Sequence, residues 1–354
     1  MDEIHSDLKN DIVKLEVAKP KIKVYSYLAF PLSIIGTQTN VKEWLFSNFI
    51  NVYSRYDSES NFIENRYDVQ FFEDDCYYLN KEAISINTLK ILNIPIIKGI
   101  CSFINEEKYV VMFLDEYYFD FLPNYHNKHT EYEVLIYGYN LKERQFYCLS
   151  YGKDQLYKSR VINFEDLESS FTKEMIDAKL PLMLFSFHNE SYRTIYKLDV
   201  SYIFHMIKNY IDGTDFYADR KKINNIDDNE LNVYGINIIN NYIKYVLRVI
   251  EMNDVEVQKL DLIQFYFFYE NKEIMLSRIC YLNSKGLVNK FYSEMYEEIT
   301  YLSRNTLNIA IKYNVRIRSG CNEYNKYLKE ILNNLKIIRT KEMNVLSSLI
   351  SNNS

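Results

Sequence analysis

Glycine-rich loops and cysteine pairs are missing from this sequence, and each absence argues against a class of protein. The eight glycines are scattered singly, with no GxGxxG or GxxxxGKS motif, which argues against the usual nucleotide-binding enzymes. The five cysteines are an odd number, are widely spaced and form no CxxC pair. Neither a disulfide framework nor a zinc site is therefore expected. We expect buried, reduced thiols at all five positions, which are Cys76, Cys101, Cys148, Cys280 and Cys321.

The chain also lacks a long apolar run and an excess of basic charge. No stretch of about 18 uncharged apolar residues occurs, so no membrane-spanning helix is expected. The N-terminal residues MDEIHSDLKNDIVKL are charged and lack the apolar centre of a signal peptide, which predicts a cytoplasmic protein. The net charge is −6 with both signs mixed along the chain. We therefore expect neither nucleic-acid nor membrane binding.

Aromatic residues are abundant, with 34 Tyr and 21 Phe beside a single Trp. The apolar fraction of 47% and the charged fraction of 25% are those of an average soluble globular protein. A length of 354 residues is enough for two domains of ordinary size.

The first half of the chain has mixed signals, with a helix followed by strands. Residues 108–118, KYVVMFLDEYY, contain a continuous apolar run that predicts a strand buried on both faces. EVLIYGYN and RQFYCLSYG follow, and predict an antiparallel hairpin with Asn140 in the turn. Earlier, NVKEWLFSNFINVY at residues 40–53 has helical spacing, with Asn40 and Glu43 spaced as a capping pair.

The second half of the chain has helical periodicity throughout. Apolar residues recur at helical spacing in five segments, at 203–211, 238–249, 262–276, 287–302 and 324–338. The polar stretch Asp212–Glu230 is the expected linker. The sequence therefore predicts an α+β protein, with a mixed domain over residues 1–200 and an α-helical bundle domain over residues 201–354.

Histidine is the usual base for nucleophilic catalysis, and the chain has only five. His126 and His129 are best placed, in a loop that leads into a strand, although loop solvation is the simpler interpretation. His5 lies near the terminus, His205 lies within a helical segment, and His188 follows an apolar run. Histidine alone therefore does not decide the function.

Acidic residues cluster at three places in the sequence. Metal binding or glycoside hydrolysis would require the members of such a cluster to converge in space, which spacing alone does not show. Solvated turns are the simpler interpretation. The clusters are Glu73 to Asp75, then Asp115, Glu116 and Asp120, and finally Asp227, Asp228 and Glu230.

The order of elements around KYVVMFLDEYYFDFLPNYHNKHTEYEVLIYGYNLKERQFYCLSYGKD resembles a bacterial family of papain-like proteins from natural-product gene clusters. The butirosin-biosynthesis acyltransferase family, which moves an acyl group from a carrier-protein thioester to an amine, is the relevant one. The resemblance is strongest over residues 108–155 and extends over 24–56. In the helical half, it rests on YGINIINNYIKYV and NKEIMLSRICYL.

The resemblance implies a papain-like fold with three catalytic positions. A cysteine would open a helix near the N-terminus, where VYSYLAFPLSIIG offers Ser26 and Ser33 and no cysteine. A histidine would begin a strand at or beside Tyr132, where the neighbour is Glu133. An acid or amide would end the next strand, where the chain has Cys148 to Ser150. All three catalytic residue types are therefore absent from the matched positions.

The residues that stand at these positions are poor catalysts. A tyrosine of pKa about 10 is a weak base near neutral pH, and an unassisted serine is a weak nucleophile. The resemblance also implies that Tyr132 and residues 25–33 face one another across a cleft.

Two hypotheses follow. In the first, the protein is a non-catalytic relative whose cleft binds an acyl carrier protein or a biosynthetic enzyme, and the helical half provides docking contacts or the interface of a homodimer. In the second, it is an active acyl- or amide-forming transferase with a relocated site, in which Cys76, Cys101 or Cys148 works with His126 or His129. Alternation along QFYCLSY favours Cys148, although a buried structural cysteine is the simpler interpretation. Neither hypothesis requires a cofactor beyond the phosphopantetheine arm of the carrier.

Overall fold

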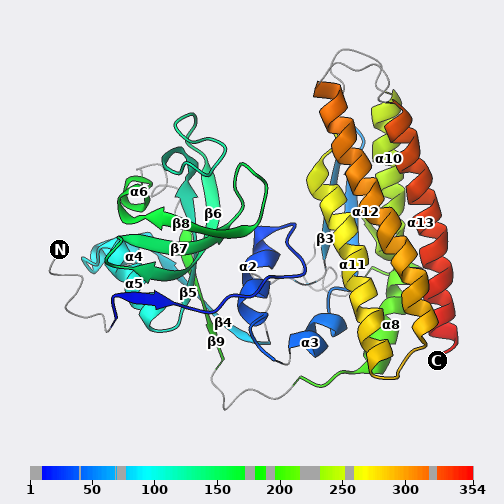
Figure 1. Cartoon of the computed structure of the whole chain (residues 1–354), viewed down its shortest axis with the longest axis horizontal. Coiled ribbons are helices and arrows are strands. Elements are labelled where there is room, and N and C mark those ends of the chain that lie inside the picture. Colours follow the sequence, from blue (N-terminus) through cyan, green and yellow to red (C-terminus); the bar gives the residue numbers. More distant parts are fainter. Residues whose placement is uncertain are drawn as a thin grey trace. The chain divides into compact units, whose positions relative to one another are not determined.

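The computed structural model of the chain describes residues 10–39, 41–67, 69, 77–171, 180–188, 196–215, 232–251, 259–318 and 325–353. The chain divides into two compact units (Figure 1). Unit 1 comprises Met1–Thr39 and Gln70–Ile195, and unit 2 comprises Asn40–Val69 and Tyr196–Ser354. The predicted α+β class with a helical C-terminal region is confirmed. Residues 40–69, which the sequence assigned to the first domain, group with the second unit.

Unit 1 is built on a seven-stranded sheet. The strands follow the order β4-β9-β5-β6-β7-β8, β1 pairs with β6, and every pairing is antiparallel. The predicted hairpin is confirmed, and the Asn140 side chain accepts a hydrogen bond from the Glu143 amide in its turn. The strands are β1 (Ile12–Lys14), β4 (Leu79–Ser85), β5 (Tyr109–Asp115), β6 (Glu131–Asn140), β7 (Gln145–Ser150), β8 (Lys158–Asn163) and β9 (Pro181–Phe187).

Helices cover both faces of this sheet, as the apolar run of the central strand β5 requires. Figure 1 shows α5 and α2 on opposite sides of the strands. The α5 face carries Val110, Met112 and Leu114 of β5, which pack in one core cluster with residues of α5. The α2 face carries the intervening β5 residues. The helical segments of unit 1 are α2 (Ser26–Ile35), α4 (Ile86–Ile91), α5 (Ile96–Asn105), the short 3-10 helix η1 (Glu116–Tyr118) and α6 (Phe164–Ser169).

Unit 2 is mainly helical, and a helix is found in each of the five segments predicted from helical spacing. The fourth helix begins at Lys290, so Leu287 lies before it, and Tyr324 of the fifth segment lies outside the described residues. A small antiparallel sheet of order β10-β2-β3 joins the early and late parts of the unit. Within the described ranges, none of the helices is long and apolar enough to cross a membrane. The elements are α3 (Val41–Ser47), β2 (Val52–Asp57), β3 (Phe62–Tyr67), α8 (Val200–Asp212), β10 (Asn232–Tyr234), α10 (Ile238–Glu251), α11 (Leu262–Ser284), α12 (Lys290–Arg318) and α13 (Asn325–Ser351).

The helix predicted over residues 40–53 is shorter than expected. It ends at Ser47 because Phe49 adopts a left-handed backbone conformation with φ 54°, after which Val52 begins β2. The buried Arg278 guanidinium of α11 donates to the carbonyl oxygens of Phe46 and Asn48, both at 2.7 Å. These bonds satisfy carbonyl groups that the end of a helix leaves without a partner. The proposed capping residue Asn40 lies outside the described residues.

The cysteine prediction is confirmed in part. Cys101 and Cys148 are buried in unit 1, whereas Cys280 on α11 is exposed, so the prediction was wrong there. Cys76 and Cys321 lie outside the described residues, as does most of the expected linker Asp212–Glu230.

Candidate functional site

The strand β6 places the two candidates for the base position on opposite faces of the sheet. Tyr132 pairs with Leu114 and packs against the core on the α5 face, whereas Glu133 pairs with Phe113 on the α2 face. Successive side chains of a strand point to opposite faces, so only one of the two can face α2. The expectation that Tyr132 faces residues 25–33 is therefore wrong, because Glu133 takes that place.

Ser26 and Glu133 form the contact between α2 and β6. Ser26 is the first residue of α2, and its hydroxyl donates a hydrogen bond to the Glu133 carboxylate. Burial raises the pKa of Glu133 above its ordinary value, and the hydrogen bond from Ser26 partly offsets this. The start of α2 thus meets the start of β6. The side chains at this contact carry a hydroxyl and a carboxyl, whereas the resemblance implies a thiol and an imidazole.

Cys148 and Ser150 lie on the face of the sheet away from α2. Cys148 pairs with Ile136 and packs in the α5-face core, so it does not share the face on which Glu133 contacts Ser26. Burial raises the pKa of the Cys148 thiol to about 12, which disfavours the thiolate that nucleophilic attack needs. Burial also raises the pKa of Cys101 to about 12. By alternation Ser150 shares the face of Cys148, and its buried hydroxyl has no hydrogen-bond partner among the described residues.

His129 forms a short pair with Asp115, the last residue of β5. The His129 Nδ1 and Asp115 Oδ2 atoms are 2.6 Å apart. The other carboxylate oxygen accepts from the backbone amides of Tyr117, at 3.1 Å, and Thr130, at 3.4 Å. The Asp115 side chain is only 2% exposed, whereas that of His129 is 61% exposed. The pair is therefore anchored on the carboxylate side and open on the imidazole side.

Asp115 and its neighbour Glu116 are both buried, so the interpretation as solvated turns is wrong for these two acids. Glu116 accepts hydrogen bonds from Asn124, at 3.1 Å from the amide nitrogen and 2.8 Å from Nδ2. Asp120 is exposed, as predicted. The position of Asp115, directly at the end of a continuous apolar strand, could have indicated that its side chain is buried. The two other acidic clusters lie outside the described residues.

His126 lies in the same loop as His129, but its surroundings are different. Its ring stacks on Tyr125, with centroids 3.9 Å apart, and its backbone is left-handed at φ 52°. Among the described residues, no carboxylate is paired with His126. The solvated-loop interpretation therefore holds for His126 and not for His129.

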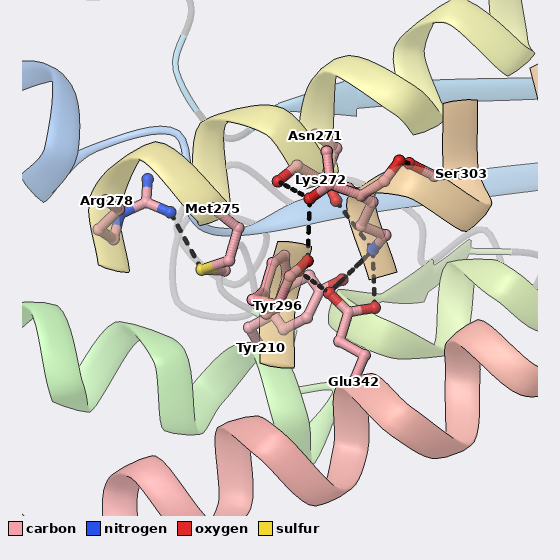
Figure 2. Close-up of polar contacts among 9 residues, drawn as sticks. Tyr210, Asn271, Lys272, Met275, Arg278, Tyr296, Ser303 and Glu342 are labelled. Carbon is pink, nitrogen blue, oxygen red and sulfur yellow. Dashed lines mark hydrogen bonds and ion pairs between the residues drawn. The ribbon is translucent and has the colours of Figure 1, made fainter. Parts of the chain in front are cut away.

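Unit 2 contains a second polar cluster, centred on a buried ion pair (Figure 2). Lys272 Nζ lies 2.8 Å from Glu342 Oε2 and donates to the Tyr210 hydroxyl at 2.7 Å. The hydroxyls of Tyr210 and Tyr296 both donate to Glu342 Oε1. Lys272 and Glu342 have no exposed side-chain surface. The cluster thus connects α8, α11, α12 and α13 inside the bundle.

Burial dominates the electrostatics of this cluster. It lowers the pKa of Lys272, although the pairing with Glu342 opposes that shift. It also raises the pKa of Tyr210 and Tyr296 well above the ordinary tyrosine value. Because the ion pair has no access to solvent, we interpret the cluster as structural. The helical periodicity could have revealed it, since Lys272 and Glu342 interrupt buried stripes of α11 and α13.

Comparison of the chain with protein-family models and with curated proteins gives no match. Within the described ranges, no group of three or more His, Cys, Asp or Glu side chains is arranged to hold a metal ion.

Proposed function

We propose that unit 1 is a papain-like module that has lost the covalent chemistry of its family and binds an acyl carrier protein, or a partner enzyme, of natural-product biosynthesis. The contact between Ser26 and Glu133 carries this proposal. It joins the start of a helix to the start of a strand, which are the two positions where the resemblance expects a nucleophile and a base.

The side chains available near these positions support binding rather than acyl transfer. Tyr132 lies on the other face, and burial raises its pKa to about 12, so it is a poor base near neutral pH. Removing the nucleophile or base of a catalytic triad typically costs about 10⁴ to 10⁶ in rate. The Ser26 hydroxyl and the Glu133 carboxyl are both partly buried polar groups that can form hydrogen bonds with a ligand.

The alternative of a relocated Cys/His site gains no support from the two described cysteines of unit 1. Cys101 and Cys148 are both in the core, with thiol pKa values raised by burial. His129 is exposed on the opposite side of the sheet from Cys148 and is paired with Asp115. Cys76 lies outside the described residues.

The test uses an acetyl-loaded, phosphopantetheinylated acyl carrier protein, with S-acetylpantetheine as a small probe. We expect the full-length protein to bind the loaded carrier in calorimetry, with no acetyl group moved to the protein or to an added amine. Glu133→Arg should weaken binding at least about tenfold, because it places a long cation at the start of α2. The control Glu168→Arg makes the same charge change at an exposed position of α6.

Because Glu133→Arg also changes a partly buried position, Ser26→Gln serves as a second variant. Circular dichroism and thermal unfolding show whether each variant is folded. Two results would contradict the proposal. One is no binding of the loaded carrier by the wild-type protein, and the other is binding as tight as wild type by both folded variants, Glu133→Arg and Ser26→Gln.

A further inference from the structure

We propose that His129 and Asp115 form a proton-transfer dyad, in which His129 Nε2 is the general base that activates water against an acyl ester or thioester. The dyad supports hydrolysis without a covalent acyl-enzyme. The inference rests on the proposed function only because the polar groups at the start of α2 would hold the acyl ligand. It adds an activity that binding alone does not include.

The first support is the fixed orientation of the imidazole. Two backbone amides, of Tyr117 and Thr130, hold one oxygen of Asp115, so that the other oxygen is aimed at His129 Nδ1 at 2.6 Å. The Tyr117 ring stacks on His129, with centroids 4.4 Å apart and an angle of 20° between the planes. A carboxylate in this position keeps the proton of neutral imidazole on Nδ1 and leaves the Nε2 lone pair available.

The second support is the asymmetric exposure of the pair. Ion pairs on a protein surface usually have two exposed members that water screens. Here the carboxylate is 2% exposed and the imidazole 61% exposed. The orienting group is thereby shielded from water, whereas the basic nitrogen can meet a substrate, which is the arrangement that general-base catalysis requires.

The third support is the location of the dyad on the α2 face. Asp115 lies two residues beyond Phe113 on β5, and Phe113 is the partner of Glu133 on β6. Alternation therefore places the side chains of Asp115 and Glu133 on the same face, as diagonal neighbours about 7–8 Å apart. A ligand held at the start of α2 lies on the face that carries the imidazole.

The reaction that this dyad supports is balanced without a cofactor. The oxygen of water forms a bond to the acyl carbon while Nε2 takes the proton. The tetrahedral intermediate then collapses, the bond from carbon to the leaving sulfur or oxygen breaks, and the proton passes from Nε2 to that leaving group. The products are a carboxylic acid and a thiol or alcohol, and the imidazole is restored. Asp115 stays ionised and stabilises the imidazolium.

The test follows hydrolysis of p-nitrophenyl acetate by the full-length protein, since this small activated ester needs no dedicated pocket. His129→Gln should lower the protein-dependent rate at least about tenfold, because a general base typically contributes about 10² to 10⁴. Asp115→Asn should also lower it, because an amide N–H facing Nδ1 moves the ring proton to Nε2. Asparagine retains an oxygen for the two backbone amides, which favours a folded variant.

The matched control is His126→Asn, since His126 lies in the same loop without a carboxylate partner among the described residues. Asparagine tolerates the left-handed backbone at that position. This variant should retain the wild-type rate within about twofold. As a second measurement, diethyl pyrocarbonate should modify His129 faster than His126, as followed by peptide mass spectrometry. Asp115→Asn should remove that difference.

Two results would overturn the inference. One is an unchanged rate in folded His129→Gln, and the other is an acetylated protein that forms and decays at the rate of nitrophenol release. The outcomes separate the two proposals. Carrier binding without His129-dependent hydrolysis contradicts the dyad alone, whereas His129-dependent hydrolysis without carrier binding contradicts the proposed function alone.

Discussion

The two units each contain a buried carboxylate beside a group that can carry positive charge, and the two pairs differ in access to solvent. In unit 2, both Lys272 and Glu342 are fully buried, and two tyrosine hydroxyls complete the pair. In unit 1, Asp115 is buried but His129 is open. The comparison shows that the same interaction can be used in two ways, since a closed pair can only hold helices together, whereas an open one can exchange a proton with a ligand.

Disrupting the closed pair in unit 2 should change the stability of the protein more than disrupting the open pair in unit 1. Burying two charges costs several kcal/mol per ion before their attraction is counted, so a buried ion pair need not add net stability. Removing only one partner is different, because the other charge then stays buried without compensation.

Glu342→Gln should reduce the free energy of unfolding by about 3–5 kcal/mol, because it leaves the Lys272 ammonium buried without its counter-charge. Denaturant unfolding measures this loss. The matched control is Glu298→Gln, which removes the partner of Lys341 from an exposed pair. It should cost about 0–1 kcal/mol. Equal losses in the two variants would show that Lys272 and Glu342 are not the closed pair described above.

Buried and exposed thiols should likewise differ in how fast they react with a thiol reagent. Native protein treated with a thiol reagent should be labelled at the exposed Cys280 and not at Cys101 or Cys148 until it unfolds, as read by peptide mass spectrometry. Cys148→Ser should cost about 1–3 kcal/mol of stability, because it buries a hydroxyl in an apolar core. Cys280→Ser provides the exposed control. Rapid native labelling of Cys148 would revive it as a candidate nucleophile.

Glu133 lies between the two extremes, and its effect should depend on pH. Burial raises its folded-state pKa, so the folded protein binds that proton more tightly than the unfolded chain. The associated stability is complete below the unfolded value, near 4.5, and is lost as the pH rises through the folded value. Glu133→Gln removes the titration, so its stability relative to wild type should increase as the pH rises above about 4.5. Unfolding measured at several pH values checks this, and a difference independent of pH would contradict it.

The fold was more predictable from the sequence than the site was. The apolar run of β5 and the helical spacing of α8 to α13 report burial directly, so these elements were found. The end of α3 depends on the backbone of Phe49 and on carbonyl contacts with Arg278, more than 200 residues away, as the separation of 229 between Arg278 and Phe49 shows. No local pattern contains that information.

The site was harder to predict because a strand changes face at every residue. The resemblance placed the base position at or beside Tyr132, and a shift of one residue exchanges the α5 face for the α2 face. Only the pairing of β5 with β6 selects Glu133. The dyad was missed for a related reason, since Asp115 ends β5 whereas His129 lies in the loop before β6. The two residues were considered separately, as a solvated acid and as a loop histidine.

The most direct test of the account is the intact mass of the protein during incubation with S-acetylpantetheine and with the acetyl-loaded carrier protein. Under the proposed papain-like resemblance, Ser26 and Glu133 occupy the positions of the thiol and the imidazole that would form an acyl-enzyme. We therefore expect the loaded carrier to bind and the mass of the protein to stay unchanged. An acetyl group that appears on Ser26 or on any cysteine, and that an added amine then removes, would contradict the proposal that unit 1 binds the carrier without covalent chemistry.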